Sequence, residues 1–562
     1  MTSALTAEYF TVLNDYTTMD LIRLLSAIVS LFFIGYVPVY FLLLKNNSSA
    51  LKFRSISGRV FVFFISFYTG MLITSIYLAI LSMTGFKYSL ANISIFSTVF
   101  FIASIYLFIR KELLISKSKL GKGNDTKTAC DNDKGCVTKD KETPGKKWKL
   151  GKNADRTIFY VFIFFIFINF LVVLFFALLF PIRFWDAIAC WSLKGRAFFI
   201  DASIMPFFKS HFYQFAHLSY PLYLPLMQTW IYAWMGKINE NLIKVIFPLF
   251  YLSGLFILYY LFRQKYRRVI AIIYVFIFSA LPVVMDHGYI EYTNLIFAII
   301  LMLAVYFFYT YVSGASHTGL SMPPNSSAAT IDPETKNYLL LSTIFFGILA
   351  QIRSEGLFFL GIFLIINLVL NIVFIIKDKK ACKSINFETG KTTAPSVSNF
   401  KKINYYSWPI LSIATPILLS LLLMAVWIVL MYKLNIRFLS REWLPVLTGG
   451  QQNNIFGQGI FSFSQALKAL FSELIFSAFD STRAYLGSSY GVLWGVLFVF
   501  FVLNIKKLFK NFNWIFFVFI AAGFIVLFYS LGAIVDFTWS TDRYVLHLLP
   551  LTYFWILYNL PA

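Results

Sequence analysis

Apolar runs of roughly 20 residues recur along the whole chain and alternate with short polar or basic segments. A run of this length can cross the hydrocarbon core of a bilayer, which is about 30 Å thick. Because that core contains no water, each run must satisfy its backbone hydrogen bonds internally, as a helix. The pattern therefore predicts an all-α polytopic membrane protein with about 13 spans, which we place at residues 21–44, 60–83, 89–109, 157–180, 242–262, 269–285, 290–312, 338–350, 357–376, 405–432, 486–504, 514–535 and 544–560.

The amino-acid composition supports a membrane protein and supplies a signal for its sidedness. Hydrophobic residues make up 59% and charged residues 13% of the 562 residues, whereas a soluble domain carries roughly 25% charged residues. The formal net charge is +23, but the lysines and arginines gather in alternate inter-helix loops. This distribution is typical of a topology signal beside membrane lipids, and we expect no nucleic-acid partner. The four cysteines give no disulfide framework.

The apolar run 220–235 decides the predicted topology. It is short and contains Pro221 and Pro225, so we interpret it as a re-entrant or surface-lying helix and not as a span. The basic loops that follow residues 44, 109, 262, 376 and 504 then all lie on one side, which is cytoplasmic by the positive-inside rule. We therefore expect an outside N-terminus and a cytoplasmic C-terminus in the plasma (inner) membrane.

Three hydrophilic segments interrupt the apolar pattern. Residues 110–156 are rich in Lys, Gly, Asp and Thr, and residues 313–337 and 377–404 are similarly polar. Because such compositions cannot bury a core, we expect disordered segments there, the first of them a basic cytoplasmic loop at 111–156. The three spans within residues 1–110 form an additional N-terminal membrane segment.

With this topology, charged and aromatic side chains gather on the outer face of the bundle, whereas the spans are almost free of charge. Lone carboxylates at lipid depth are costly and are typically functional. Helix caps and anchors in the headgroup region use the same residue types, which is the alternative interpretation for each of them. The candidate site residues are Asp186, Lys194, His217, Tyr220, Asp286, Glu291, Arg353, Glu355, Asp542 and Arg543.

The order of these features resembles the GT-C superfamily of membrane glycosyltransferases, which includes the protein O-mannosyltransferases and the lipid A aminoarabinose transferases. Those enzymes have an essential Asp near the start of an outer loop, then surface-lying helices with a Tyr/Pro-rich entry. A span that ends in Arg at the cytoplasmic face follows, and then a second outer acidic motif. The counterparts here are Asp186, Tyr220-Pro221-Leu222, the basic cluster 263–268, and Asp286 with Glu291.

The resemblance extends from residue 157 to residue 560 and implies a GT-C-like transmembrane catalytic domain at 157–562, with outer-face juxtamembrane helices. In that domain, outer loop 181–241 would be catalytic and outer loop 433–485 would bind substrate or acceptor. The sequence departs from the mannosyltransferases after Asp186, where Ala187 replaces their Glu. The resemblance implies either no cofactor or a divalent cation, Mg²⁺ or Mn²⁺, held by Asp186, Asp286 and Glu291.

The chemistry of the residues leads to the same class of enzyme. The sequence has no Rossmann-type fingerprint for a nucleotide sugar, so we expect a donor that resides in lipid, a sugar on a polyprenyl phosphate. One carboxylate suffices as the general base of an inverting displacement, and Asp186 is the candidate. Cations must stabilise the phosphate that leaves, for which the candidates are Lys194, Arg353 and Arg543. His217, Asp286 and Glu291 would orient the sugar or the acceptor.

Two other membrane functions stay open at this point. A multi-pass transporter or flippase of a lipid-linked or small-molecule substrate would have the same apolar bulk, but typically carries charges or broken helices at mid-membrane. The predicted spans contain few such features apart from two prolines that could break a helix, Pro248 and Pro282. An O-antigen polymerase or ligase would be expected to use a large outer loop rich in Arg and His. For the glycosyltransferase, the acceptor would be an extracytoplasmic glycan, lipid or protein.

Overall fold

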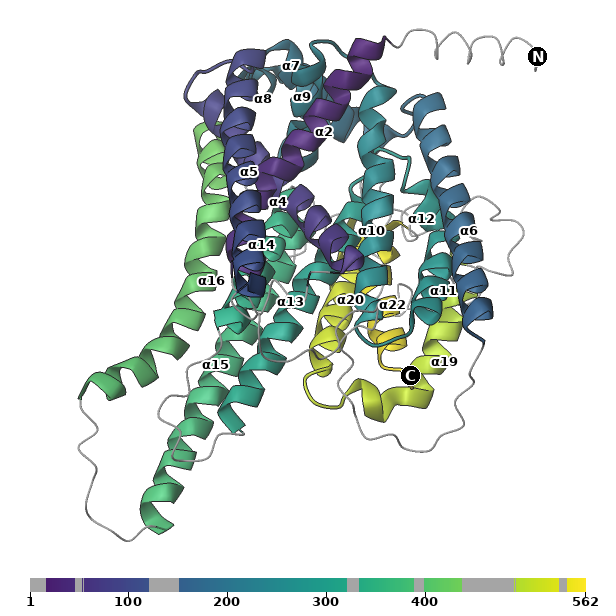
Figure 1. Cartoon of the computed structure of the whole chain (residues 1–562). Helices are drawn as coiled ribbons and strands as arrows, with labels where there is room; N and C mark the ends of the chain where they lie inside the picture. Colours follow the sequence, from purple (N-terminus) through teal and green to yellow (C-terminus); the bar gives the residue numbers. More distant parts are fainter. Residues whose placement is uncertain are drawn as a thin grey trace.

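The computed structural model describes residues 17–45, 53, 55–120, 151–320, 333–388, 399–436, 490, 492–534 and 543–561. Within this part of the chain every regular element is a helix (Figure 1). Eight of the described helices are long and apolar enough to cross a membrane. The predicted all-α fold is therefore confirmed, and the apolar helices indicate a multi-pass membrane protein.

The helices lie close to the predicted spans. The long ones are α2 (Thr18–Val39) with its π-helical continuation η1 (Tyr40–Leu44), α4 (Ile56–Met83), α5 (Leu90–Leu120), α6 (Lys152–Leu179), α10 (Ile246–Arg263), α13 (Asn294–Leu320), α14 (Pro333–Ile352), α15 (Glu355–Glu388), α16 (Asn399–Lys433), α19 (Leu493–Leu508) and α20 (Trp514–Ile534). The shorter ones are η2 (Asp186–Ser192), α7 (Leu193–Ile200), α8 (Met205–Lys209), η3 (His211–Ala216), α9 (Tyr223–Met235), η4 (Leu242–Val245), α11 (Arg268–Ser279), α12 (Pro282–Asp286) and α22 (Leu549–Tyr558). Every predicted span coincides with at least one helix, whereas the number that cross a membrane stays a prediction.

The predicted span 269–285 is not one continuous helix. It divides into α11 and α12, because Leu281 has an extended backbone (ψ 124°) and Pro282 begins the next helix. Proline disfavours the helical conformation of the residue before it and lacks the N–H that a continuing helix needs. The prediction of an unbroken helix was wrong here, and the break makes Asp286 the end of a short helix ahead of α13.

Helices extend into all three of the predicted disordered segments. α5 continues to Leu120 and α6 begins at Lys152, both inside the predicted loop 111–156. The helices α13 to α16 likewise enter the polar segments 313–337 and 377–404. Lys and Glu are good helix formers, so a helix that starts in an apolar run propagates into a charged one. The predicted boundaries were wrong, and the remainder of these segments lies outside the described residues.

The run 220–235 forms α9, which packs inside the bundle. All of its side chains except Trp234 are buried, and it contacts α2, α4 and α7. The Trp230 indole Nε1 donates a hydrogen bond to the Ser30 hydroxyl on α2, at 3.1 Å. In Figure 1, α7, α8 and α9 lie together beside the first turns of α2. The helix is therefore covered by its neighbours, and its interpretation as a re-entrant or surface-lying helix stays a prediction.

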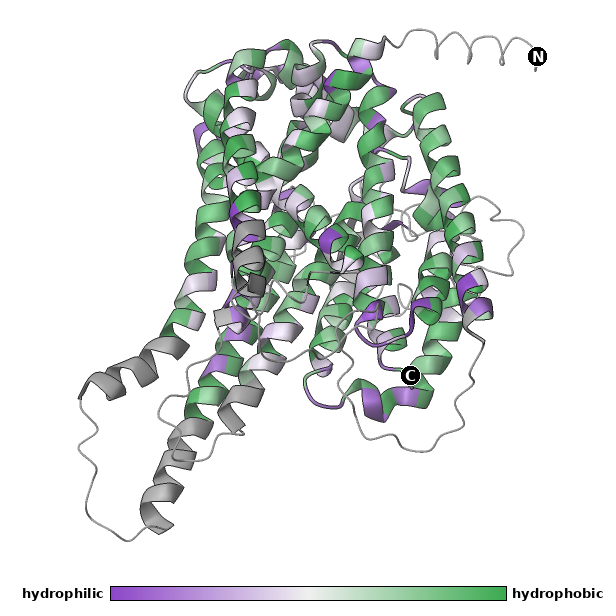
Figure 2. Cartoon of the chain, in the orientation of Figure 1, coloured by the Kyte–Doolittle hydropathy of each residue, from purple (hydrophilic) through white to green (hydrophobic). Residues whose placement is uncertain are grey.

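Several helices carry apolar side chains on the outside of the bundle. On α6, Tyr160, Phe164, Phe167 and Phe175 are all exposed. Figure 2 shows hydrophobic residues along the length of the helices, with hydrophilic residues mainly at helix ends and turns. An apolar surface of this extent would be unfavourable in water and is suited to contact with lipid.

Three segments that are distant in sequence meet where the candidate site lies. α13 and α14 pack along each other, α14 turns directly into α15, and α22 packs on α13. The turn between α14 and α15 depends on Gly356, because a Cβ atom there would lie 2.1 Å from the Leu349 carbonyl oxygen. Arg353 in this turn contacts Asn294 at the start of α13 and Tyr544 in the segment before α22.

Candidate functional site

Asp186 begins the π-helix η2, shortly after the end of α6. π-Helical turns are rare and often occur at functional sites. The Asp186 Oδ2 atom accepts a hydrogen bond from Arg543 Nη1 at 2.6 Å, although the two residues are 357 positions apart in the chain. The two side chains are 37% and 23% exposed, in the order Asp186 and Arg543. The structure thus joins two of the predicted site residues in a partly accessible ion pair.

Aromatic rings and the start of α13 position Arg543. Its guanidinium lies 5.3 Å from the centroid of the Tyr292 ring and 5.8 Å from that of the Tyr544 ring, which are distances of cation–π interactions. The Asn294 side-chain amide donates a hydrogen bond to the Arg543 carbonyl oxygen at 2.9 Å. The end of the chain is therefore tied to the first turn of α13.

Arg353 lies in the turn between α14 and α15 and is more deeply buried than Arg543. Its Nη2 atom is 2.9 Å from Glu355 Oε1, in an ion pair whose side chains are 11% and 9% exposed. The same guanidinium donates to the Asn294 side-chain oxygen at 3.3 Å and to the Tyr544 hydroxyl at 3.2 Å. Both arginines are therefore attached to the same first turn of α13.

Tyr544 connects the two arginines, because its ring centroid lies 5.1 Å from the Arg353 guanidinium and 5.8 Å from that of Arg543. We call the group formed by Asp186, Arg353, Glu355, Arg543 and Tyr544 the arginine cluster. Two carboxylates balance its two guanidinium charges, so an incoming anion must compete with a carboxylate for a cation. The Asp186–Arg543 pair is the more accessible of the two ion pairs, and competition is easier there.

Two buried histidines flank the arginine cluster. The His287 ring centroid lies 6.0 Å from that of Tyr292, and the His547 centroid lies 5.5 Å from that of Tyr544. Burial lowers the pKa of His287 to about 4, so its imidazole is neutral at pH 7. Its Nδ1 atom is 2.9 Å from the Val283 carbonyl oxygen and must carry the proton. Nε2 is then an acceptor, and it has no hydrogen-bond partner in the part of the chain that is described.

Lys194, His217 and Tyr220 form a second group. The Lys194 Nζ atom donates a hydrogen bond to the His217 carbonyl oxygen at 2.8 Å and lies 5.8 Å from the Tyr220 ring centroid. The Tyr220 ring stacks on both Trp191 and His217, at 5.7 and 4.8 Å. Lys194 is completely buried, and burial lowers its pKa to about 7. Tyr220 also interacts electrostatically with Arg353, which places this group beside the arginine cluster.

Asp286 and Glu291 have partners outside the arginine cluster. The Asp286 carboxylate accepts a hydrogen bond from the Tyr289 hydroxyl at 2.9 Å. Glu291 precedes α13 and lies 3.7 Å from Lys244, in an ion pair that is almost completely buried. Burial raises the pKa of Glu291 to about 7 and also raises the pKa of Asp286.

The residues do not fit the divalent cation that the resemblance implied. Asp186, Asp286 and Glu291 each contact a different partner, and no group of three His, Cys, Asp or Glu that could hold a metal occurs among the described residues. We therefore derive no step through a metal ion. One of the ten predicted site residues, Asp542, lies outside the described residues, as does loop 433–485 beyond residue 436.

Sequence reasoning missed several residues that contact the arginine cluster, among them Asn294, Tyr292 and His547. His547 follows Arg543 by four positions, the spacing that puts two side chains on one face of a helical turn. That spacing was the available signal. No sequence signal distinguished Tyr292 from the other aromatic residues, which make up 20% of this sequence.

Comparison of the chain with protein-family models, with curated proteins and with solved structures gives no match. The resemblance to GT-C glycosyltransferases therefore stays a prediction from the sequence motifs. The function must be argued from the arrangement of the side chains themselves.

Proposed function

We propose that this protein is an integral-membrane glycosyltransferase that moves a sugar from a polyprenyl-phosphate donor to an extracytoplasmic acceptor, with inversion at the anomeric carbon. The observation that carries the proposal is the contact of Asp186 with Arg543 next to a second, buried arginine, Arg353. The reaction needs a base for the acceptor hydroxyl and cations for the departing phosphate. Both kinds of group are present in the arginine cluster.

The donor phosphate would bind first to Arg543, whose guanidinium is partly exposed. The planar fork of an arginine matches two phosphate oxygens. Arg353 would supply a second cation from a fixed position, because Glu355, Asn294 and Tyr544 all hold its guanidinium. Negative charge grows on the phosphate as the glycosidic bond breaks, and cations already held in place stabilise that charge without reorganisation.

Phosphate binding would also release the base. In the resting structure Arg543 occupies one oxygen of the Asp186 carboxylate. A phosphate that binds Arg543 competes for that contact, and the carboxylate can then accept the proton of an acceptor hydroxyl. The acceptor oxygen forms its bond to the anomeric carbon while the carbon–oxygen bond to the phosphate breaks. The proton moves to Asp186 and the electron pair leaves with the phosphate, which gives inversion.

The residues around the arginine cluster are suited to a sugar. The Tyr220 and His217 rings are partly exposed and stack on each other, and such faces bind the apolar sides of sugar rings. The Nε2 atom of His287 is buried and has no hydrogen-bond partner among the described residues, so it could accept a hydrogen bond from a sugar hydroxyl that reaches it. These contacts would fix the orientation of the donor relative to Asp186.

The test is transfer of label by purified protein in liposomes. Polyprenyl-phosphate-linked glucose, mannose and arabinose, each radiolabelled in the sugar, are supplied together with unlabelled lipid and glycan extracts as acceptors. The Asp186→Asn variant keeps the size and hydrogen bonding of the side chain but cannot take up a proton. We expect transfer to fall by about 10²- to 10⁴-fold, the usual contribution of a general base, while the labelled donor still binds.

Asp201→Asn is the matched control, because Asp201 is an exposed aspartate in the same outer loop. It should transfer at the normal rate. Near-normal transfer by Asp186→Asn would remove Asp186 as the base. Uptake of intact labelled lipid into the other leaflet, with no transfer, would establish a flippase instead. Extension of a lipid-linked glycan chain would establish the polymerase or ligase alternative.

A further inference from the structure

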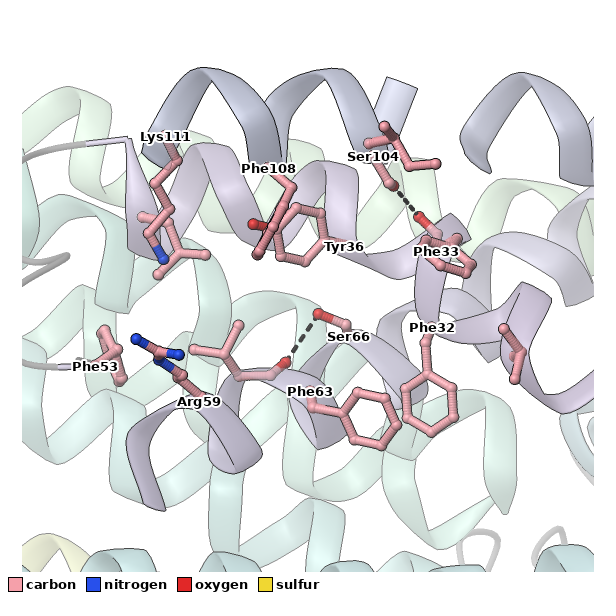
Figure 3. Close-up of a pocket in the computed structure, with 14 residues that line it drawn as sticks. Phe32, Phe33, Tyr36, Phe53, Arg59, Phe63, Ser66, Ser104, Phe108 and Lys111 are labelled. Atoms are coloured by element: carbon pink, nitrogen blue, oxygen red, sulfur yellow. Dashed lines mark hydrogen bonds between the residues drawn. The ribbon is translucent and has the colours of Figure 1, made fainter. Parts of the chain in front are cut away.

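A groove on the N-terminal segment lies apart from the arginine cluster. It has a volume of about 440 Å³, within the range of about 300–1,000 Å³ that is usual for ligand pockets. Its walls come from α2, α4 and α5, and they consist mostly of apolar and aromatic side chains (Figure 3). The lining residues Val29, Phe63, Ile105 and Phe108 are exposed at the outside of the bundle. The groove therefore opens sideways, toward the region that lipid chains occupy.

The groove results from how these three helices pack. α2 and α4 touch closely at Gly35 and Gly70, where an added Cβ atom would lie 1.8 Å from a backbone oxygen of the other helix. α5 also packs on α2, and the Ser104 hydroxyl donates a hydrogen bond to the Phe33 carbonyl oxygen at 2.6 Å. α4 and α5 are thus held on either side of α2, and the groove lies between them.

The charges of the groove are confined to one end. Arg59 on α4 and Lys111 on α5 face the cavity from opposite walls, with Phe53 beside them (Figure 3). Among the described residues that line the groove there is no carboxylate. An amphiphile with one anionic head and an apolar tail matches this distribution, because the head lies between the two cations and the tail lies among the aromatic rings.

We propose that this groove binds an anionic phospholipid, with its phosphate between Arg59 and Lys111 and an acyl chain along Phe32, Phe33 and Phe108. Two cations next to a membrane surface attract anionic headgroups. A zwitterionic lipid has no net charge and should therefore bind more weakly. The bound lipid fills the space between α4 and α5 and so becomes part of the N-terminal segment. The proposal does not depend on the proposed transferase reaction.

The experiment measures lipid retained by the full-length protein. Detergent-purified protein is mixed with equal amounts of phosphatidylglycerol and phosphatidylcholine of the same chain length, and the complexes are counted by native mass spectrometry. Wild type should retain phosphatidylglycerol preferentially. The double variant Arg59→Gln/Lys111→Gln should weaken that binding by roughly 10- to 30-fold, as follows from about 1 kcal/mol for each cation near a membrane surface.

Arg110→Gln is the matched control, because Arg110 neighbours Lys111 but is exposed and does not line the groove. It should leave the preference unchanged. Ile105→Trp keeps every charge and fills the groove from its exposed side, and it should also reduce retention. Equal retention of both lipids by wild type, or an unchanged preference in the double variant, would overturn the proposal. So would displacement of phosphatidylglycerol by an equal amount of polyprenyl phosphate, which would assign the groove to the donor lipid.

Discussion

Arg353 and Lys433 are both cations next to predicted outer loops, but only Arg353 is held by partners. Arg353 is 11% exposed and pairs with Glu355, whereas Lys433 is exposed at the end of α16. If Arg353 meets the donor phosphate, Arg353→Ala should slow transfer or weaken donor binding by about 2–4 kcal/mol, the cost of losing a contact that stabilises the transition state. Lys433→Ala should have little effect. Transfer rate and donor affinity in liposomes measure both.

Truncation of Arg353 alone leaves Glu355 buried without its cation, which can destabilise the fold by about 3–5 kcal/mol. The double variant Arg353→Ala/Glu355→Gln removes both charges and serves as the control for folding. It should restore the apparent melting temperature but not the transfer rate. If the double variant also restored transfer, or if Arg353→Ala and Lys433→Ala had equal and small effects, Arg353 would be only an anchor.

Lys194 gives a pH-dependent prediction. Burial lowers its pKa from 10.5 to about 7, so between these values the unfolded chain binds a proton that the folded protein does not. The contribution of Lys194 to stability therefore rises as pH increases from 7 to 10.5, and the full cost of its buried charge is present below pH 7. Relative to wild type, Lys194→Met should be most favourable below pH 7 and lose that advantage toward pH 10.

Melting curves of both proteins at pH 6, 7, 8.5 and 10 measure this difference. Loss of the hydrogen bond from Lys194 to the His217 carbonyl adds an offset that does not vary with pH. Lys433→Met is the control, since that lysine is exposed, and its difference from wild type should be constant. A constant difference for Lys194→Met as well would show that Lys194 keeps its charge throughout.

The residues of the candidate site could be predicted from sequence, but their partners could not. Composition and topology identified Asp186, Arg353 and Arg543 as charges out of place in an apolar chain. Their contacts depend on the packing of segments up to 357 positions apart, which no local pattern encodes. Asp286 was identified by the same reasoning, and its predicted role in orienting the substrate stays a prediction; its carboxylate accepts a hydrogen bond from Tyr289.

At the scale of single helices, the crossing of α2 and α4 gives a direct test of packing. Gly35 touches the Ser66 backbone oxygen so closely that a Cβ atom would lie 1.8 Å from it. Gly35→Val must push the helices apart, which should cost about 1–3 kcal/mol as overpacking does. Gly361→Ala is the matched control, because Gly361 lies in α15 with nothing within 4 Å of an added Cβ. It should be neutral or slightly stabilising, and equal loss of melting temperature in both variants would contradict the close approach.

The elements themselves were predictable where the apolar pattern was continuous. Each run of about 20 apolar residues became a helix because the bilayer allows little else. The errors occurred where two signals competed. At Pro282 the missing N–H outweighed the apolar pattern, and beyond residue 109 the helix propensity of charged residues extended α5 to Leu120.

For the whole molecule, the number of spans depends on helices that are too short to cross a membrane alone. The helices α11 and α22 are apolar but are only 12 and 10 residues long. In an apolar bundle such helices can end inside protein instead of at the membrane surface. The number of spans therefore follows from the side of the membrane on which each loop lies, and not from the apolar pattern alone.

The sidedness of the chain is tested by accessibility of single cysteines in a cysteine-free background. The positive-inside rule predicts that the turn with Lys87 and the loop 433–485 lie outside, and that the loop 110–156 and the turn with Lys510 lie in the cytoplasm. Lys87 and Lys510 are exposed, and their turns lie at opposite ends of the bundle (Figure 1).

Cysteines at Lys87 and within 433–485 should therefore react with an impermeant thiol reagent on intact cells. Those at Lys510 and within 110–156 should react only after permeabilisation, which also serves as the control for reactivity. The reverse pattern would place the Asp186 loop in the cytoplasm, where nucleotide sugars are available, and the argument for a polyprenyl-phosphate donor would then fail.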